Sequence, residues 1–449
     1  MSILEELQWR SLVADCTDTA ELTRKLSTPI TLYCGFDPTA DSLHVGNLVP
    51  LLALRRFQLL GHHPIAVAGG ATGCIGDPSG KSQERQLLTP EVLDHNIASV
   101  KTQLAKLLDF ETKQNPARLV DNASWTKNIS YLDFLRDIGK YFSVNQMVAK
   151  ESVRARMEDR EVGISYTEFS YMLLQAFDFM VLCRDYNCEL QIGGSDQWGN
   201  ITAGIELTRK KLGRQVFGLT LPLITNADGS KFGKSVTGAI WLDPKRTSVE
   251  DFYQFWIRTD DRDVIRYLKF FTFLSRDEIY VLEKKHAEDP GAREAHKVLA
   301  KVVTDLLHPA KSGSEQTNET SVSTQGAIIA AEIIYHKPLE NFTEADFENL
   351  RKHGHSKEID MAVFAEPGIH LAQLLFRVGL SRSVSEARKD ISIDKGIKVG
   401  SMYEIPPNQP PRLRSVINPI FPIKADHLIF NRYLLLRKGK KNYVVVTAK

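Results

Sequence analysis

The chain has 449 residues, more than one hydrophobic core usually supports, so we expect two or three domains. Its 43% apolar and 25% charged residues are typical of a globular protein. No apolar run reaches the roughly 18 to 20 residues that a membrane-spanning helix needs. The five cysteines show neither a disulfide framework nor the paired spacing of a structural zinc site. These features predict no membrane span, no disulfide and no bound metal.

The first sixteen residues carry acidic side chains, Glu5, Glu6 and Asp15, before any apolar block. A secretory signal has a positively charged start and a transit peptide is rich in arginine, so neither is indicated. The cysteines are odd in number, which favours reduced thiols. We therefore expect a cytoplasmic protein.

A buried strand is predicted at Ile30–Phe36, ended by a turn at Asp37–Ser42. A helix is expected from about His44 to Leu60, with Gly61 as its stop signal. Later strands are expected at Pro64–Ala68, Glu189–Ile192 and Leu219–Ile224, with helices over much of 90–185 and at Asn200–Leu212. This alternation predicts an α/β fold, a Rossmann-like parallel sheet with ligands at the carboxyl ends of its strands.

The rest of the chain predicts two further regions. Ser248 to about His308 has a helical pattern, and the polar stretch Pro309–Gln325 is interpreted as an insertion or linker. We expect a catalytic domain at 1–245, a helical domain at 246–350 with the insertion at 309–325, and a small α+β domain at 368–449.

The charge is distributed unevenly along the chain. Gly368–Lys449 carries 15 Lys and Arg against 5 Asp and Glu, a net charge of +10, which leaves −8 for the remainder. Leu371, Leu374 and Leu375 alternate with polar residues there, so this segment is not a solvated tail. A folded basic module on an acidic body is typical of a protein that binds a polyanion.

The first group of candidate residues follows the strand at Ile30–Phe36. Asp37-Pro38-Thr39 and then His44-Val45-Gly46-Asn47 place polar groups at a strand end and a helix start, where backbone N–H groups favour an anion. Gly46 lets a nucleotide ring approach the backbone closely, and Thr39 and His44 are candidate donors to a phosphate. Taken alone, such a turn is more often only a turn.

The second group is Lys231-Phe232-Gly233-Lys234-Ser235, in a loop flanked by turn signals. Two lysines and a hydroxyl on a glycine-hinged loop are suited to closing over a triphosphate, although a solvated basic loop is the commoner meaning of such a run. With His44–Asn47, in this order, the loop resembles the paired signatures of class I aminoacyl-tRNA synthetases. Asn47 departs from the histidine that usually ends the first signature.

A third group indicates the amino acid. Tyr171, Gln175 and Asp178 are spaced i, i+4, i+7, so they share one face of a mostly apolar helix and should face something polar. Asp77 follows a glycine-rich turn, and Gln191–Asn200 forms another polar strand end. These blocks closely resemble bacterial tyrosyl-tRNA synthetases over nearly the whole chain.

The resemblance implies a role for each site residue. For tyrosine it implies contacts from Tyr33 and Asp178 to the phenol, from Asp77, Tyr171 and Gln175 to the ammonium, from Gln197 near the carboxyl group, and support from Asn122. For ATP it implies Cys34, Gly35, Asp37, His44, Gly46, Asn47, Gly194, Asp196, Lys231 and Lys234. The expected catalytic residues are Thr39, His44, Lys81, Arg85, Lys231, Lys234 and Ser235.

The implied function is ligation of tyrosine to its tRNA. ATP would serve as a substrate with Mg²⁺, without a tightly bound cofactor, and tRNA(Tyr), L-tyrosine and a second copy in a homodimer would be the partners. Segment 370–399, with Arg382 and Arg388-Lys389, resembles an S4-type RNA-binding domain.

Two alternatives stay open at this point. A tryptophanyl-tRNA synthetase shares the fold, but an indole only donates, whereas Tyr33 with Asp178 offers both a donor and an acceptor. An RNA-binding protein without catalysis would not need His44, Lys231 and Lys234 intact.

Overall fold

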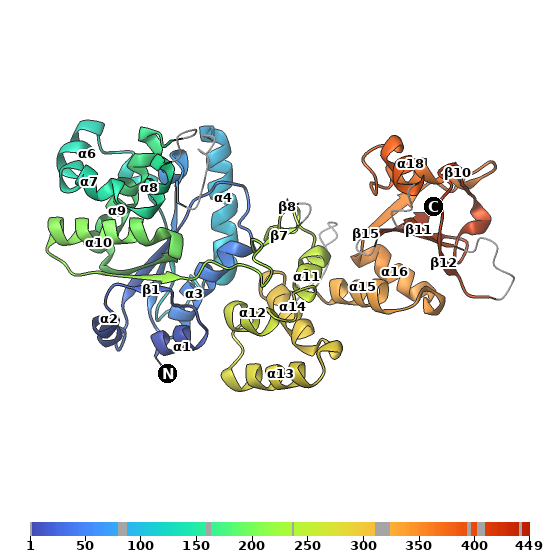
Figure 1. The fold of residues 1–449 in the computed structure, drawn as a ribbon, viewed down its shortest axis with the longest axis horizontal. Coiled ribbons are helices and arrows are strands. Elements are labelled where there is room, and N and C mark those ends of the chain that lie inside the picture. Colours follow the sequence, from blue (N-terminus) through green and yellow to red (C-terminus); the bar gives the residue numbers. More distant parts are fainter. Residues whose placement is uncertain are drawn as a thin grey trace. The chain divides into compact units, whose positions relative to one another are not determined.

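A six-stranded sheet forms the centre of the N-terminal part of the chain (Figure 1). Its strand order is β1-β6-β5-β2-β3-β4, and β6, β5, β2, β3 and β4 are parallel, while β1 is antiparallel to β6. The strands are β1 Asp15–Cys16, β2 Thr31–Phe36, β3 His63–Ala68, β4 Arg118–Asp121, β5 Cys188–Gly194 and β6 Phe217–Leu221. The predicted α/β class with a parallel sheet is confirmed.

The computed structural model describes residues 2–79, 88–158, 163–235, 238–309, 324–392, 397–401, 409–439 and 442–449. It divides into two compact units, Met1–Ser248 with Ile257–Leu307, and Val249–Trp256 with His308–Lys449. Within the part of the chain that is described, none of the helices has both the length and the apolar character needed to cross a membrane.

Helices cover both faces of the sheet. On one face, Phe179 and Leu182 of α9 pack against Tyr33, Ile65 and Val67. Helix α10 lies against α9, and α3 and α4 contact the strands too (Figure 1). These helices are α3 Leu48–Leu59, α4 Pro90–Leu107, α9 Tyr166–Tyr186 and α10 Trp198–Leu212.

Two element boundaries differ from the sequence prediction. The helix expected from about His44 begins as a 3₁₀ turn, Val45–Asn47, because the His44 ring and the Asn47 amide cap this turn before α3 starts at Leu48. The last strand ends at Leu221 and not near Ile224, because the chain beyond it leaves the sheet and Leu223 is exposed.

The C-terminal unit has its own five-stranded sheet in the order β12-β11-β14-β15-β9. Apolar residues of α15 and α16 pack on one face of it, around Tyr433 and Val445, and α17 and α18 pack on the other. The strands are β9 Ser356–Ile359, β11 Ile397–Ser401, β12 Arg412–Ser415, β14 Tyr433–Lys438 and β15 Asn442–Ala448. The helices are α15 Thr324–His336, α16 Glu344–His353, α17 Leu371–Arg377 and α18 Val384–Ser392.

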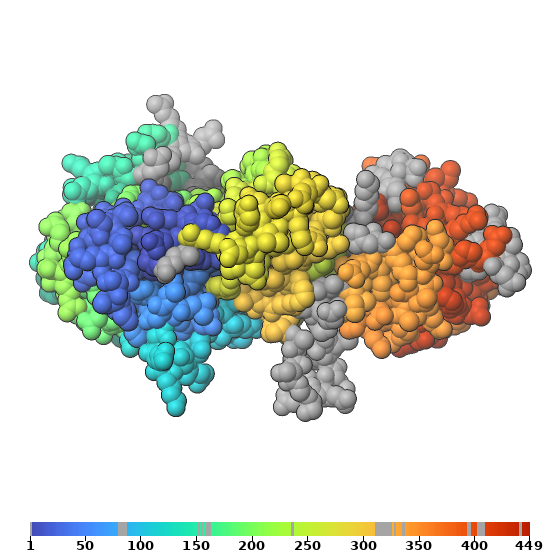
Figure 2. Space-filling model, turned by 90° about the horizontal axis from the view of Figure 1, so that it is seen from below, coloured from blue at the N-terminus to red at the C-terminus, as the bar shows by residue number. Residues whose placement is uncertain are grey.

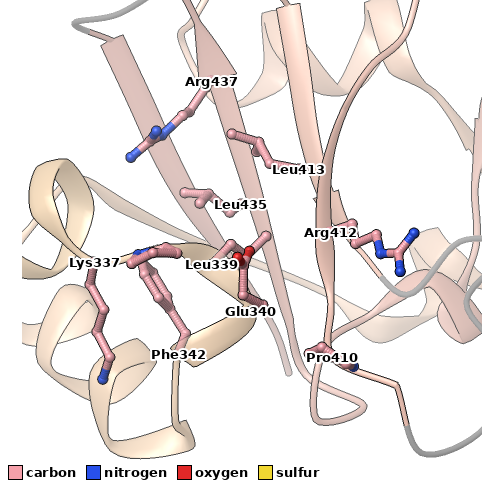
Figure 3. Close-up of a pocket in the computed structure, with 10 residues that line it drawn as sticks. Lys337, Leu339, Glu340, Phe342, Pro410, Arg412, Leu413, Leu435 and Arg437 are labelled. Carbon is pink, nitrogen blue, oxygen red and sulfur yellow. The ribbon is translucent and has the colours of Figure 1, made fainter.

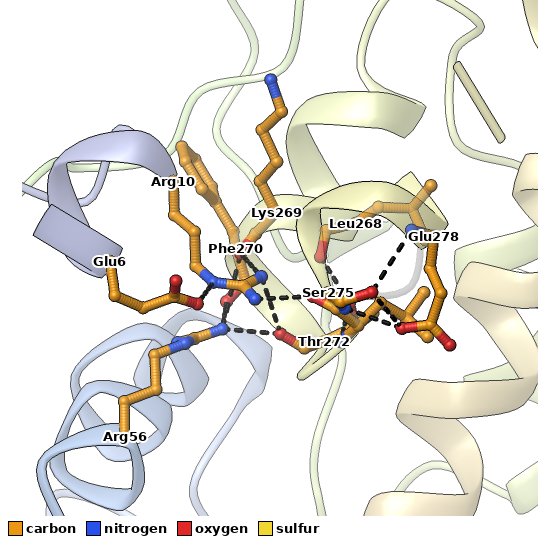
Figure 4. Close-up of polar contacts among 10 residues, drawn as sticks. Glu6, Arg10, Arg56, Leu268, Lys269, Phe270, Thr272, Ser275 and Glu278 are labelled. Carbon is orange, nitrogen blue, oxygen red and sulfur yellow. Dashed lines mark hydrogen bonds and ion pairs between the residues drawn. The ribbon is translucent and has the colours of Figure 1, made fainter. Parts of the chain in front are cut away.

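A helical segment of the N-terminal unit is tied to the N-terminus of the chain. It comprises α12 Val264–Phe271, α13 Arg276–Glu288 and α14 Glu294–Leu307. In Figure 2 this yellow segment lies beside the blue N-terminal segment. Arg10 donates through Nη1 to the Lys269 carbonyl at 2.9 Å and through Nη2 to the Leu274 carbonyl at 2.7 Å (Figure 4).

Arg56 of α3 reaches the same place. Its Nη2 atom donates to the carbonyls of Phe270 and Thr272 at 3.0 and 2.8 Å, and Arg56 is 3% exposed. The last carbonyls of a helix have no partner within the helix and carry partial negative charge. The two arginines therefore cap the end of α12 and hold the helical segment on the sheet domain.

We predict that Arg10→Ala lowers the free energy of unfolding of the N-terminal unit by about 2 to 3 kcal/mol, because its charge-assisted hydrogen bonds are lost and the Leu274 carbonyl loses its arginine donor. Urea denaturation followed by circular dichroism measures this change. Arg24→Ala is the control, since Arg24 makes only an exposed pair with Glu21 and its loss should have little effect. Equal stability of the two variants would contradict the capping role.

Candidate active site

The carboxyl ends of the parallel strands bring the predicted site residues to one edge of the sheet. Asp37 follows β2, Asn122 follows β4, and Asp196 and Gln197 follow β5. Helix α9 confirms the shared face of Tyr171, Gln175 and Asp178, because all three lie within its bounds at helical spacing. Ligand sites of open α/β sheets form at this edge.

Asp37 is held by two hydroxyl groups. Tyr171 donates to its Oδ2 atom at 2.7 Å, and Thr72 donates to its Oδ1 atom at 2.7 Å. Burial, with the charges of Asp37 and Asp77, raises the pKa of Tyr171 well above its usual value, so this phenol is a donor. Gly69 is required beside it, because a Cβ atom there would lie 2.1 Å from Asp37 Oδ1.

Asp178 is a buried carboxylate between two donors. Asn122 donates to its Oδ2 atom at 3.0 Å, and the Trp125 indole donates to Oδ1 at 2.8 Å. Burial raises the pKa of Asp178 to about 7, and the two hydrogen bonds oppose this shift. Asn122 is itself fixed by the Ala71 N–H, which donates to its Oδ1 atom at 2.7 Å. The carboxyl group thus has a defined orientation.

Tyr33 is 2% exposed, and its hydroxyl makes no hydrogen bond to any residue in the described ranges. Its ring packs edge-on against Phe179, with 5.3 Å between centroids. Burial and the nearby charge of Asp178 raise the pKa of Tyr33 well above its usual value. A buried hydroxyl without a partner is uncommon and costly, and is expected where a ligand supplies the partner.

Asp77 forms a second polar group with Ser79, with Gln197 of the 3₁₀ turn after β5 and with Asn200 of α10. Gln197 donates to its Oδ2 atom at 2.6 Å, and the backbone N–H of Ser79 donates to Oδ1 at 3.0 Å. Asn200 contacts both Gln197 and Asp77, at 3.2 and 3.4 Å. Gln175 is half-buried on the face of α9 that also carries Tyr171. Carboxylate and amide oxygens here suit an ammonium group.

The His44–Asn47 segment caps itself. His44 Nδ1 accepts from the Gly46 N–H at 3.0 Å, and Asn47 Oδ1 accepts from the His44 N–H at 3.0 Å. A Cβ atom on Gly46 would lie 2.8 Å from His44 Cε1. Gly46 is therefore needed by the His44 ring, a reason additional to the close nucleotide approach expected from the sequence.

The loop that carries Lys231 and Lys234 meets this segment through the backbone. The Val45 N–H donates to the Ile240 carbonyl, and the Ile240 N–H donates to the Gly233 carbonyl, both at 3.0 Å. Gly233 has a φ of +77°, and a Cβ there would lie 2.7 Å from Val45 Cγ2. The two predicted signatures are thus brought together.

The lysines of this loop face solvent while its apolar residue is anchored. Phe232 stacks on Phe271 with 5.2 Å between centroids. Lys231 and Lys234 are both exposed. Asp263 Oδ2 accepts from the Ala227 N–H at 2.8 Å and so holds the start of the loop. The loop thus carries two exposed lysine ammonium groups, while Phe232 and Asp263 hold its backbone in place.

Other predicted nucleotide contacts lie at the ends of β2 and β5. Burial raises the pKa of the Cys34 thiol to about 12, so it stays protonated at neutral pH. Burial also raises the pKa of Asp196, and the charge of Asp77 acts in the same direction. Gly35 and Thr39 are exposed. Gly194 adjoins Asp196, since a Cβ there would lie 2.5 Å from Asp196 Oδ1.

For three predicted site residues the structure describes no side chain, and three residues of the site were not predicted from the sequence. Lys81 and Arg85 lie outside the described residues, as does the side chain of Ser235. Sequence reasoning did not select Thr72, Trp125 or Asn200, whose side chains hold Asp37, Asp178 and Asp77. Thr72 could have been selected because it lies shortly after the end of a predicted strand. Trp125 could have been selected because it lies in the polar segment that follows Asp121.

A cavity of about 560 Å³ lies in the C-terminal unit (Figure 3). Phe342, Leu413 and Leu435 form its apolar walls, and Arg412 and Arg437 are among its basic residues. Arg437 also donates to the Ile334 carbonyl. None of the residues that line this cavity belongs to the predicted active site.

The sequence model of the tRNA synthetases of class I (W and Y) matches residues 25–322. That span contains strands β2 to β6 of the sheet, both signature segments and every predicted tyrosine and ATP contact. The chain belongs to this family.

Among proteins of this family, the chain is similar to tyrosine–tRNA ligases. The chain is 55% identical to the tyrosine–tRNA ligase of Opitutus terrae over 447 residues, which cover 99% of each protein. It is 49% identical to the tyrosine–tRNA ligase of Geobacillus kaustophilus over 450 residues, again 99% of each. A C-terminally truncated mitochondrial tyrosyl-tRNA synthetase from Aspergillus nidulans superposes with a TM-score of 0.62 at 33% identity, over 68% of this chain and 90% of that one.

The raised pKa of Asp178 predicts a dependence of stability on pH. Burial raises this pKa from 3.8 to about 7, so the folded protein binds the proton more tightly than the unfolded chain does. This contribution to stability is complete below pH about 4 and is lost as the pH rises through about 7. The stability of the wild type relative to Asp178→Asn should therefore fall between pH 5 and 8, by at most about 1.4 kcal/mol per pH unit.

Urea denaturation of both proteins at each pH measures this difference. Asp133→Asn, which removes an exposed carboxylate on a short surface helix, is the control and should show no such trend. A pH-independent difference between the wild type and Asp178→Asn would mean that Asp178 is ionised over the whole range.

Proposed function

We propose that this protein is a tyrosine–tRNA ligase, which activates L-tyrosine with ATP and transfers it to the 3′ end of tRNA(Tyr). The observation that carries the proposal is the buried pair of Tyr33, whose hydroxyl has no partner within the described ranges, and Asp178, oriented by Asn122 and Trp125. A substrate phenol donates to the Asp178 carboxylate and accepts from the Tyr33 hydroxyl. Phenylalanine satisfies neither group.

The other end of the substrate is an amino acid. Asp77 and the Asp37-bound Tyr171 hydroxyl supply oxygens for its ammonium, with Gln175 on the same helix face. Gln197 already contacts Asp77 at 2.6 Å and lies at the end of β5, where the carboxyl group would sit. An ammonium needs acceptors and a carboxylate needs donors, and this division of the polar groups supplies both.

In the first step the tyrosine carboxylate attacks the α-phosphorus of ATP in line, forming tyrosyl-adenylate and releasing diphosphate. Lys231 and Lys234 stabilise the charge that develops on the phosphates, together with Thr39, His44, Lys81, Arg85 and Ser235. Asp196 and Gly194 bind the ribose with Cys34, and Gly35, Asp37, Gly46 and Asn47 complete the nucleotide site. Mg²⁺ accompanies ATP as part of the substrate. No side chain acts as a covalent nucleophile, so positioning supplies much of the acceleration.

In the second step a ribose hydroxyl of the tRNA attacks the tyrosyl carbonyl and AMP leaves. We propose that the chain has three domains: a catalytic domain (1–245), an anticodon-side helical domain (246–350), and an S4-like RNA-binding domain formed by the +10 segment, residues 368–449. Arg382, Arg388 and Lys389 support this role, because all three are exposed on or beside α18. Lysine and arginine contacts to phosphates supply most non-specific attraction to RNA.

We further propose a cytoplasmic homodimer. The supporting observation for the dimer is a group of exposed apolar and aromatic side chains, Tyr131, Leu132, Val144 and Tyr166. The hydroxyls of Tyr131 and Tyr166 lie 3.2 Å apart, so α6 (Tyr131–Asp137) and the start of α9 form one surface there. Exposed apolar patches of this kind are typical of protein–protein interfaces. Five free cysteines support a reducing compartment.

The direct test is ATP–pyrophosphate exchange with each of the twenty amino acids, followed by charging of tRNA(Tyr). Exchange driven by tyrosine, with charging, supports the ligase. Exchange driven by tryptophan would favour the related synthetase that shares the fold. Binding of tRNA without exchange for any amino acid would favour an RNA-binding protein that lacks catalysis.

We predict that Lys234→Ala slows adenylate formation by roughly 10²-fold to 10³-fold, the usual loss for one donor to transition-state charge. Equilibrium binding of tyrosine should hardly change, because the loop acts on phosphates. Single-turnover kinetics and tyrosine titration measure the two quantities. Lys245→Ala, at an exposed lysine after the loop, is the control. Normal adenylate formation by Lys234→Ala would remove this loop from the phosphate site.

We also predict that the double variant Arg388→Gln, Lys389→Gln weakens tRNA binding and lowers the magnitude of its salt slope by about one to two, since each phosphate contact contributes nearly one. Pyrophosphate exchange should stay normal. The matched control is Arg24→Gln, Lys25→Gln in the last turn of α2 (Thr19–Lys25). Filter binding of tRNA at several salt concentrations provides the measurement, and an unchanged slope would exclude α18 from the RNA interface.

A further inference from the structure

Three potential metal ligands meet in the helical segment of the N-terminal unit. Asp261 lies in the loop that precedes α12, His286 in the last turn of α13, and His296 in α14. One ring nitrogen of each histidine and one carboxylate oxygen all lie within 4.8 Å of one another. None of these residues takes part in the tyrosine, ATP or tRNA sites proposed above.

His296 is fully buried, with 0% exposure, and neither ring nitrogen makes a hydrogen bond within the described ranges. Its Nε2 atom lies 3.1 Å from Asp261 Oδ1. Burial lowers the pKa of His296 to about 4, and Arg293 acts in the same direction. A neutral imidazole with an available lone pair is the form that binds metals.

A hydrogen bond fixes the tautomer of His286. Its Nε2 atom lies 3.1 Å from the backbone carbonyl of Asp261, so this nitrogen carries the proton. An imidazole that donates through Nε2 keeps the lone pair of Nδ1. Within the described ranges the Nδ1 atom of His286 is buried without a hydrogen-bond partner. A backbone carbonyl that fixes the tautomer is the usual support of a metal-binding histidine.

We propose that Asp261, His286 and His296 bind a divalent transition metal, with Zn²⁺ the ion that fits best. Two imidazole nitrogens and a carboxylate oxygen are ligands that Zn²⁺ takes, with a water completing the tetrahedron. At zinc–ligand distances of about 2.0 to 2.1 Å, neighbouring ligand atoms lie roughly 3.3 Å apart. The 3.1 Å pair already meets this spacing, and the exposed Asp261 and half-buried His286 can rotate to close the others.

The positive charge of Arg293 opposes metal binding at this site. Arg293 Nη1 lies 3.6 Å from Asp261 Oδ1 and competes for that oxygen. We therefore expect weaker binding than at a site with four protein ligands. A bound ion would connect α13, α14 and the loop ahead of α12, the same loop that continues to Asp263 and its contact with Ala227. A bound ion would thus stabilise the segment around Asp263, which holds the start of the loop that carries Lys231 and Lys234.

The test is equilibrium dialysis of the full chain, freed of metal by a chelator, against Zn²⁺ alone. The wild type should bind one ion more than His286→Asn and Asp261→Asn, each of which should lose affinity at this site by about tenfold or more. Neither variant removes the fully buried His296, so both should fold. His95→Asn, at an exposed histidine on α4, should bind as the wild type does.

Thermal unfolding provides a second readout. Zn²⁺ should raise the unfolding midpoint of the wild type and of His95→Asn, and have no effect on His286→Asn or Asp261→Asn, because only the folded cluster holds the ion. Equal zinc stoichiometry in all four proteins, or no zinc-dependent shift in the wild type, would overturn the proposal.

Discussion

Burial of carboxylates at the carboxyl edge of a parallel sheet is the constraint on which the rest of the active site depends. Asp178 lies where desolvation penalises its charge, and the half-buried Asp37 lies at the same edge, so both depend on donors in fixed positions. Tyr171 and Thr72 donate hydrogen bonds to Asp37, and Asn122 and Trp125 donate hydrogen bonds to Asp178. These donors come from α9 and from the turns after β3 and β4. The packing of the sheet and α9 therefore sets the geometry of the candidate site, in which the Tyr33 hydroxyl has no hydrogen-bond partner within the described residues.

A second constraint links the two signature segments. Backbone hydrogen bonds run from Val45 to Ile240 and from Ile240 to Gly233, so a shift of the lysine loop is transmitted to the His44 turn. Phe232 and Asp263 anchor this loop on the helical segment, which Arg10 and Arg56 in turn hold through the end of α12. Residues distant in sequence thus support the proposed nucleotide site. Lys231 and Lys234 are exposed in this assembly, as the proposed contact with phosphates requires.

Features encoded locally could be predicted from the sequence, and partnerships across long separations could not. The parallel sheet, the polar face of α9 and both signatures follow from periodicity and turn residues within short windows. Strand β1 has only two residues, too few for a pattern. Asn122 and Asp178 are 56 positions apart, and no local signal pairs them. The His286, His296 and Asp261 cluster matches no metal-binding spacing, because a loop and two helices bring it together.

The most direct test of this account is the ratio of kcat/KM for tyrosine to that for phenylalanine in pyrophosphate exchange, compared between the wild type and Tyr33→Phe. The variant removes only the buried hydroxyl and keeps the ring against Phe179. If Tyr33 and Asp178 recognise a phenol, the ratio should fall by about tenfold to a hundredfold, the value of one buried hydrogen bond next to a charge. An unchanged ratio would show that selection for the phenol occurs elsewhere, and would contradict the central claim.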